Sequence, residues 1–301
     1  MTVIPAAGGS LRVPQAHLQE VGGVPLIARA IRTAKAAKLA GARSFWQEFY
    51  GASAVEIVIV GDFDPAAVKT QVQAAFGTWK SAKPFTRLAG VYQDRPVSRV
   101  TVETPDKESA VFAAGQRIRM RDDDPDYPAM LLGNFMTGGG FLNSRLAARL
   151  RQKEGLSYGV NSNFNASSFD ADAQFGSFAI YAPQNAEKLV AAYREEITKL
   201  LQTGFTADEV AEAKKGWLQG RAVSRSTDRE LARMLAQREY TGRTLTWDAA
   251  LEKRVEALTP EQILAGMRKH LDETKISFVQ AGDWAKAKAT RGGAAGSHTP
   301  R

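Results

Sequence analysis

The stretch from residue 138 to residue 158, GGGFLNSRLAARLRQKEGLSY, constrains the fold most strongly. Its three glycines allow close backbone approach or positive φ angles. A helical run then continues to about residue 152, and a strand pattern starts at residue 157. Arg151 and Tyr158 lie seven residues apart, between the helix and the strand. A guanidinium and a phenol are therefore expected beside one helix-to-strand junction.

Strand and helix periodicities both occur in the second half of the chain. The clearest alternation lies at 172–182, where the odd-numbered residues from Phe175 to Tyr181 face opposite to the even-numbered ones. Strands are expected at 98–104, 109–116, 157–166, 172–182 and 275–280. Helices are expected at about 125–137, at 142–152 and over most of the remainder. This pattern predicts an α+β fold, with an antiparallel-rich sheet packed against helices.

Several residues have the spacing of helix caps. Asp64 precedes Pro65 and is expected to cap a helix that ends near Trp79. The acidic residues Asp122–Asp124 are predicted to cap the helix after them, with cation binding as the alternative. Capping boxes are expected at three further helices. These boxes pair Thr206 with Glu209, Thr227 with Glu230, and Thr259 with Gln262.

The chain is expected to hold a complete domain preceded by a truncated copy of the same domain. The sequence EIVIVGD at 56–62, within an expected strand at 54–60, is echoed by KISFVQAGD at 275–283. Both segments have the pattern of the last strand of a repeated unit. We expect an N-terminal fragment at 1–43, the end of a first repeat at 44–80, a linker at 81–96, a complete domain at 97–284 and a tail at 285–301.

Composition excludes several kinds of site. The absence of cysteine rules out disulfides, thiolate catalysis and cysteine-based zinc sites. The net charge of +8 comes from basic residues interleaved with acids, and no aromatic and basic stacking motif accompanies them, so no nucleic-acid interface is expected. No run of 18 apolar residues occurs, so no membrane span is expected, and the compartment stays open.

Histidine usage argues against hydrolytic zinc in this chain. The three histidines are His17, His270 and His298, and neither H-x-x-E-H nor H-E-x-x-H occurs. Zinc hydrolases need two histidines on one helical face and a carboxylate base. His270 is expected at a helix end, where it can interact with terminal carbonyl groups. The chain alone is therefore predicted to bind no catalytic metal and to cleave no peptide.

Five motifs in order resemble the pitrilysin and insulinase metallopeptidases. They are FYGAS at 49–53, VGDFDP at 60–65, DDPDYPAM at 123–130, GGGFLNSRL at 138–146 and LRQKEGLSYGV at 150–160. The resemblance covers roughly residues 45–284. In that family two homologous α+β domains face each other, one with the inverted zinc motif and one that closes over the peptide. The residues here resemble the closing domain.

The resemblance implies roles for particular residues. Arg151 and Tyr158 match the arginine and tyrosine that reach across to the zinc site and contact the peptide backbone, and a phenol can donate to an oxygen that gains charge. The alternative is that Arg151 ends a helix and Tyr158 packs in a strand. A substrate-handling loop is implied, less specifically, at Gly138, Gly139, Gly140 and Phe141; the alternative is that the glycine run only ends the helix at 125–137 and turns into the next. Zinc would then be held by a homologous partner subunit that acts on a peptide substrate.

Other functions stay open. A structural or assembly module of the same family would need neither Arg151 nor Tyr158. The first 41 residues, with VIPAAGGSLRVP and GGVPLIARAI, resemble the start of sugar nucleotidyltransferases, where a glycine-rich turn cradles phosphates. Gln15, Ala16 and His17 stand where those enzymes place a basic residue. We expect this opening segment to be inactive.

Overall fold

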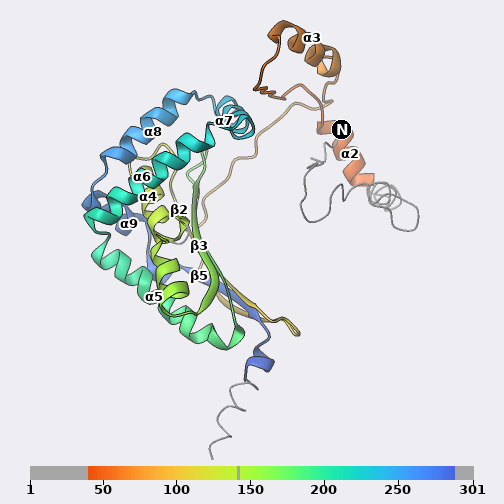
Figure 1. Cartoon of the computed structure of the whole chain (residues 1–301). Coiled ribbons are helices and arrows are strands. Elements are labelled where there is room, and N and C mark those ends of the chain that lie inside the picture. Colours follow the sequence, from red (N-terminus) through yellow and green to blue (C-terminus); the bar gives the residue numbers. More distant parts are fainter. Residues whose placement is uncertain (1–39, 141–142, 289–301) are drawn as a thin grey trace, which may run out of the picture. The chain divides into compact units, whose positions relative to one another are not determined.

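The computed structural model describes residues 40–140 and 143–288 (Figure 1). The chain divides into two compact units. One comprises Met1–Val55 and Asp62–Arg87, and the other comprises Glu56–Gly61 and Leu88–Arg301. The second, which we call the sheet unit, contains the whole β-sheet. Residues 1–39, which make up nearly all of the opening segment that resembles nucleotidyltransferases, lie outside the described residues.

Within its described residues, the first unit contains the helices α2 (Ala40–Phe49) and α3 (Pro65–Phe76). The cap expected at Asp64 is confirmed, since its Oδ1 accepts hydrogen bonds from the backbone N–H groups of Ala66 at 2.8 Å and Ala67 at 3.2 Å. The helix ends at Phe76, before the expected Trp79. Backbone hydrogen bonds from Ala52 to Trp79 and from Lys83 to Glu48 join the segments around these helices.

The strand expected at 54–60 is wrong. Residues 55–60 form no ladder with any described strand. The apolar side chains of Val55, Ile57 and Ile59 are 44 to 48% exposed. An isolated strand leaves its backbone groups without partners, so an apolar pattern alone does not produce a sheet.

In the part of the sheet unit that the structure describes, five strands form one sheet in the order β1-β5-β2-β4-β3. All neighbours are antiparallel except β1 and β5, so the antiparallel-rich sheet expected from the sequence is confirmed. The strands are β1 (Arg99–Glu103), β2 (Ala110–Ile118), β3 (Ser157–Ala166), β4 (Ala173–Tyr181) and β5 (Ser277–Gly282).

The helices of this unit lie to one side of the sheet (Figure 1). Between them and the sheet lies one apolar core that includes Phe112, Phe175, Leu150 and Ile197. Tyr193 is buried there, which raises its pKa to about 12 although Ser177 accepts its hydrogen bond. The helices are α4 (Tyr127–Asn134), α5 (Ala186–Thr203), α6 (Ala207–Ser224), α7 (Asp228–Tyr240), α8 (Leu245–Ala257) and α9 (Pro260–His270), with 3-10 turns η5 (Pro183–Asn185) and η6 (Glu273–Lys275).

The opposite face of the sheet is open within the described part of this unit. On β4, Phe175 and Tyr181 are buried, whereas Phe178 and Ile180 are about two-fifths exposed. Val279 on β5 and Val100 on β1 are exposed to a similar extent. The alternation expected at 172–182 is therefore confirmed, and it separates a helix-covered face from an uncovered apolar one.

Two of the three expected capping boxes are confirmed. Thr206 with Glu209 begins α6, and Thr259 with Gln262 begins α9, with both reciprocal hydrogen bonds present in each. The box expected at Thr227 is wrong, because its side chain makes no cap hydrogen bond to α7. Thr227 Oγ1 instead lies 3.5 Å from the carbonyl oxygen of Ser224.

The helices expected at 125–137 and 142–152 contain π turns. These are η2 (Phe135–Gly139) and η4 (Ala147–Lys153), with hydrogen bonds from Gly140 N to Phe135 O at 2.6 Å and from Glu154 N to Arg149 O at 3.3 Å. Each bond spans five residues instead of four. An apolar period near 3.6 residues does not reveal such an extra residue. The expected helices are therefore in the right place with a different local geometry.

Candidate functional site

Arg151 lies near the end of η4, on a turn that its neighbours Arg149 and Leu150 anchor to the rest of the unit. Leu150 is fully buried, whereas Arg151 is exposed. Arg149 forms ion pairs with Glu154 at 2.6 Å and with Glu195 at 2.8 Å, which tie the end of η4 to α5. Among the described residues, Arg151 has no hydrogen-bond or ion-pair partner. Its guanidinium therefore lies at the surface, and its N–H groups donate to none of the described residues.

The turn between Arg151 and Tyr158 is short and well anchored. Gly155 has φ +61°, in the left-handed region that glycine adopts without steric cost. The backbone N–H of Leu156 donates to the carbonyl of Leu150 at 2.8 Å, and both leucine side chains lie in the core. The helix and strand are thereby joined by one backbone bond and one apolar contact region, which favours a fixed position for the two exposed side chains.

Tyr158 occupies a β-bulge at the start of β3. Ser157 pairs with Tyr181 and Gly159 pairs with Ile180, so Tyr158 is the extra residue between two consecutive pairs. Its side chain is 65% exposed, and no described residue forms a hydrogen bond with it. Bulges re-aim side chains near strand ends. Along β3 the even-numbered Ser162 and Phe164 are buried, and a regular strand would bury Tyr158 as well. Because of the bulge, the side chain of Tyr158 is exposed instead.

The glycine run mainly packs a helix against a strand. A Cβ on Gly138 would lie 2.5 Å from the backbone nitrogen of Ser162 on β3, so only glycine fits there. Ser162 in turn donates to the side-chain oxygen of Asn134 at 2.8 Å. Gly139 is exposed and Gly140 is half-buried next to Phe135. Phe141, the fourth residue expected in this substrate loop, lies outside the described residues.

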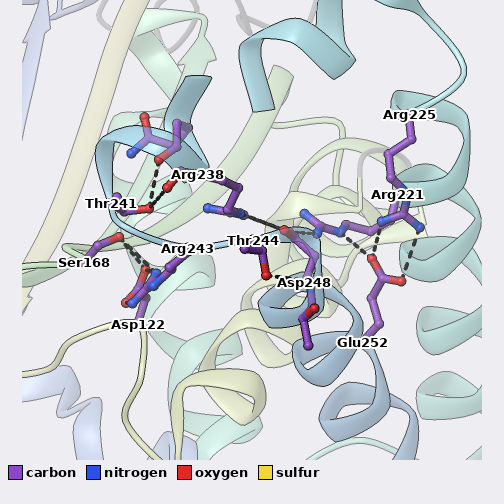
Figure 2. A network of polar contacts seen from close by, with 12 residues as sticks. Asp122, Ser168, Arg221, Arg225, Arg238, Thr241, Arg243, Thr244, Asp248 and Glu252 are labelled. Atoms are coloured by element: carbon purple, nitrogen blue, oxygen red, sulfur yellow. Dashed lines mark hydrogen bonds and ion pairs between the residues drawn. The ribbon is translucent and has the colours of Figure 1, made fainter. Parts of the chain in front are cut away.

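A network of arginines and acids joins α6, α7 and α8 (Figure 2). Asp248 is almost fully buried and accepts hydrogen bonds from Arg238 at 2.7 and 2.8 Å and from Arg221. Glu252 binds Arg221 and Arg225. Burial alone would raise the pKa of Asp248, but the bonds from Arg238 and Arg221 together hold this pKa below its usual range. Sequence reasoning missed this network, although Arg221 and Arg225 have the spacing of one helical face.

The expectation for Asp122–Asp124 needs correction. Asp122 is buried and forms a bidentate pair with Arg243, at 2.5 and 2.6 Å, and Ser168 donates to the same carboxylate. Asp124 accepts from the backbone of Asp126, which precedes the first residue of α4. The carboxylates therefore serve a tertiary ion pair and a turn. A partner 121 residues away cannot be read from local spacing.

One cluster among the described residues has ligand atoms close enough for a metal, namely Asp124, Asp126 and His270. Lys269 Nζ lies 2.6 Å from Asp126 Oδ2, and His270 Nε2 lies 2.8 Å from the same oxygen. The bond from Lys269 keeps the pKa of Asp126 low. An ammonium group thus already neutralises this carboxylate, and one histidine with two aspartates lacks the two-histidine set of a zinc hydrolase. His270, expected to meet helix-terminal carbonyls, contacts this carboxylate instead.

The family follows from comparison with known proteins. A family model described as the peptidase M16 inactive domain matches residues 39–216. The chain belongs to this family. The motifs at 49–65 and 123–160 indicated the pitrilysin and insulinase type, and this resemblance is confirmed.

Relatives of this M16 chain include proteins named as a protease and as a non-peptidase. It is 30% identical over 233 residues to an uncharacterised zinc protease of Streptomyces coelicolor, covering 75% of this chain and 50% of that protein. It is 25% identical over 174 residues to the non-peptidase homolog YmxG of Helicobacter pylori, covering 58% of this chain and 39% of the other. The chain thus spans half or less of the length of these curated relatives.

Solved structures show the same fold. A peptidase M16 inactive domain from Pseudomonas fluorescens is 27% identical, with a TM-score of 0.69 over 81% of this chain and 57% of that one. A protease from Helicobacter pylori, 17% identical, has a TM-score of 0.61 and covers 74% of this chain and 53% of that one. Among the described residues, no helix has the length and apolar character needed to cross a bilayer.

Proposed function

We propose that this chain is the noncatalytic, substrate-binding part of an M16 peptidase and supplies Arg151 and Tyr158 to the active site of a zinc-bearing homologue. The observation that carries the proposal is the anchored junction of η4 and β3, which presents both side chains to solvent without described partners. Exposed polar groups on a rigid support are suited to act on a ligand.

Each side chain has a distinct task in this proposal. The guanidinium of Arg151 donates to backbone carbonyls of the bound peptide and fixes its position. The phenol of Tyr158 donates to the carbonyl oxygen that gains negative charge during attack. The homologue's zinc, when bound, activates the attacking water. The cleavage itself belongs to the partner, because this chain lacks H-x-x-E-H.

The test is reconstitution with a homologue that contains the zinc motif. Adding this chain should increase peptide cleavage by the homologue, and Tyr158→Phe should reduce the kcat of the mixed enzyme about a hundredfold. Arg151→Ala should mainly raise KM. The matched controls are Tyr240→Phe and Arg229→Ala, which alter exposed residues on α7.

Two results would reject the proposal. One is no gain in cleavage on mixing, although a complex forms. The other is an equal loss from the control substitutions. A stable complex whose function is unaffected by Arg151→Ala would instead favour the structural or assembly role, which agrees with the relative named a non-peptidase homolog.

A further inference from the structure

A cavity of about 550 Å³ lies at the end of β2, in the sheet unit. One wall is the segment 92–98 that leads into β1, and the other walls include the last residues of β2, the start of β5 and Gln174 at the start of β4. The volume is in the range of sites that hold small ligands or a few residues of a peptide. The cavity is not lined by Arg151, by Tyr158 or by the glycine run at 138–140.

The wall formed by the incoming segment is fixed at two points. Near its start, the backbone N–H of Gly90 donates to Asp170 at 2.9 Å, in the turn between β3 and β4. At its end, Ser98 is bonded through its N–H to Ser277 Oγ at 3.0 Å, and its carbonyl accepts from Phe278 at 2.9 Å. These bonds hold the incoming segment near both of its ends, so the wall that it forms is fixed.

The lining of the cavity carries more cationic than acidic side chains. Two of its cations are neutralised, since Arg117 pairs with Asp172 and Lys269 pairs with Asp126. The other three cations are exposed and form no ion pair within the described residues. Asp94 also lines the cavity. These unpaired cations are Arg95, Arg119 and Lys275.

The sequence contains a signal for this arrangement. Arg117, Arg119 and Arg121 alternate at the end of β2, in QRIRMR. A period of two places alternate side chains of an extended chain on one side. Arg121 pairs with Asp123, whereas Arg119 lines the cavity. Of the other two unpaired cations, Lys275 comes from the segment before β5 and Arg95 from the segment before β1.

We propose that this cavity binds an acidic segment of the peptide substrate. The unpaired guanidinium and ammonium groups are complementary to side-chain carboxylates, and arginine binds carboxylates in a bidentate geometry. The inference rests on the proposed function, because it assigns the anion to the same peptide that Arg151 and Tyr158 contact. It also predicts that the mixed enzyme prefers peptides with acidic residues at a defined separation from the cleaved bond.

The sheet register sets that separation. Tyr158 lies beside the pair of Ser157 with Tyr181, and Gln174 on the cavity wall precedes Tyr181 by seven residues along β4. At about 3.4 Å per residue this corresponds to about 24 Å. An extended peptide would cover it with about seven residues. Acidic residues about seven positions from the cleaved bond should therefore bind more tightly than acids next to it.

The direct test measures binding to the full chain by fluorescence anisotropy. The probe is a labelled peptide of about twelve residues that carries either a cluster of glutamates or the same number of glutamines at one end and is otherwise uncharged. The glutamate peptide should bind about tenfold more tightly at low salt. The double variant Arg119→Gln/Lys275→Gln should remove most of this difference. The double variant Arg229→Gln/Lys253→Gln changes the net charge equally on α7 and α8 and should keep it.

Three outcomes would overturn the assignment. They are equal binding of the two peptides, equal loss in both double variants, and displacement by inorganic phosphate at the affinity of the peptide itself. A separate experiment tests the proposed function, with the glutamine peptide as the substrate of the reconstituted enzyme. If Tyr158→Phe lowers the cleavage of this peptide while the preference for the glutamate peptide is absent, only the assignment of the acidic site is wrong. If mixing yields no cleavage while the preference persists, only the proposed function fails.

Discussion

At the scale of single residues, Asp248 should be among the most sensitive positions. Its side chain is 2% exposed and is bound by Arg221 and Arg238. Asp248→Ala leaves two guanidinium groups without their carboxylate in a half-buried site, and should lower the free energy of unfolding by about 3 to 5 kcal/mol. Urea denaturation followed by circular dichroism measures this. Asp123→Ala, which breaks an exposed pair with Arg121, should cost less than about 1 kcal/mol.

The same residue predicts how stability depends on pH. The pKa of Asp248 is depressed in the folded state. Its contribution is therefore present above the unfolded pKa of about 3.9 and is lost as the pH falls toward the folded value. The wild-type advantage over Asp248→Asn should be constant from about pH 5 to pH 7 and should shrink below about pH 4. An advantage that instead grows on acidification would contradict the depressed pKa.

Gly138 gives a steric prediction at the same scale. Gly138→Ala brings a methyl group against the backbone of Ser162 and should destabilise the protein by about 1 to 3 kcal/mol. Gly220 in α6 is the matched control, because a Cβ there meets nothing within 4 Å. Gly220→Ala should stabilise by about 0.5 to 1 kcal/mol. Thermal unfolding of both variants checks the pair, and similar shifts would argue against close packing of η2 on β3.

At the scale of elements, helix caps allow a comparison between two threonines. Thr259 makes both bonds of a capping box at α9, whereas Thr227 makes no cap bond at α7. Thr259→Ala should therefore cost about 1 kcal/mol, and Thr227→Ala only a few tenths. Chemical denaturation at neutral pH resolves this difference. Equal costs would show that the reciprocal bonds at Thr259 do not determine the stability of α9.

Local patterns predicted most elements of the sheet unit. Alternation located β4, and threonine spacing located the starts of α6 and α9, because these signals depend on neighbours in sequence. The π turns at η2 and η4 could not be found, since an apolar period near 3.6 residues does not reveal an extra residue within one turn. The segment at 54–60 has the apolar composition of a strand, but no described strand pairs with it. Of the candidate site, the Arg151 and Tyr158 positions came from motifs, while the Asp122 pair with Arg243 depends on tertiary contacts.

At the scale of the whole molecule, the two units predict a proteolysis pattern. The segment that joins α3 to β1 contains basic residues at 80, 83, 87 and 95, but Lys83 and Arg95 precede prolines, where trypsin cleaves poorly. Limited digestion should cut after Lys80 and Arg87 and leave a stable fragment that starts at Ser81 or Leu88. Mass spectrometry identifies its ends. Earlier cleavage inside α6 or α8 would contradict a compact sheet unit.

The bulge at Tyr158 makes this position independent of the side chain that occupies it. Because one inserted residue in the ladder, and not the phenol, sets the outward direction, another side chain placed there should project in the same way. A photoreactive amino acid at position 158 would thus mark whatever the junction approaches inside a cell, while the strand beneath keeps its register.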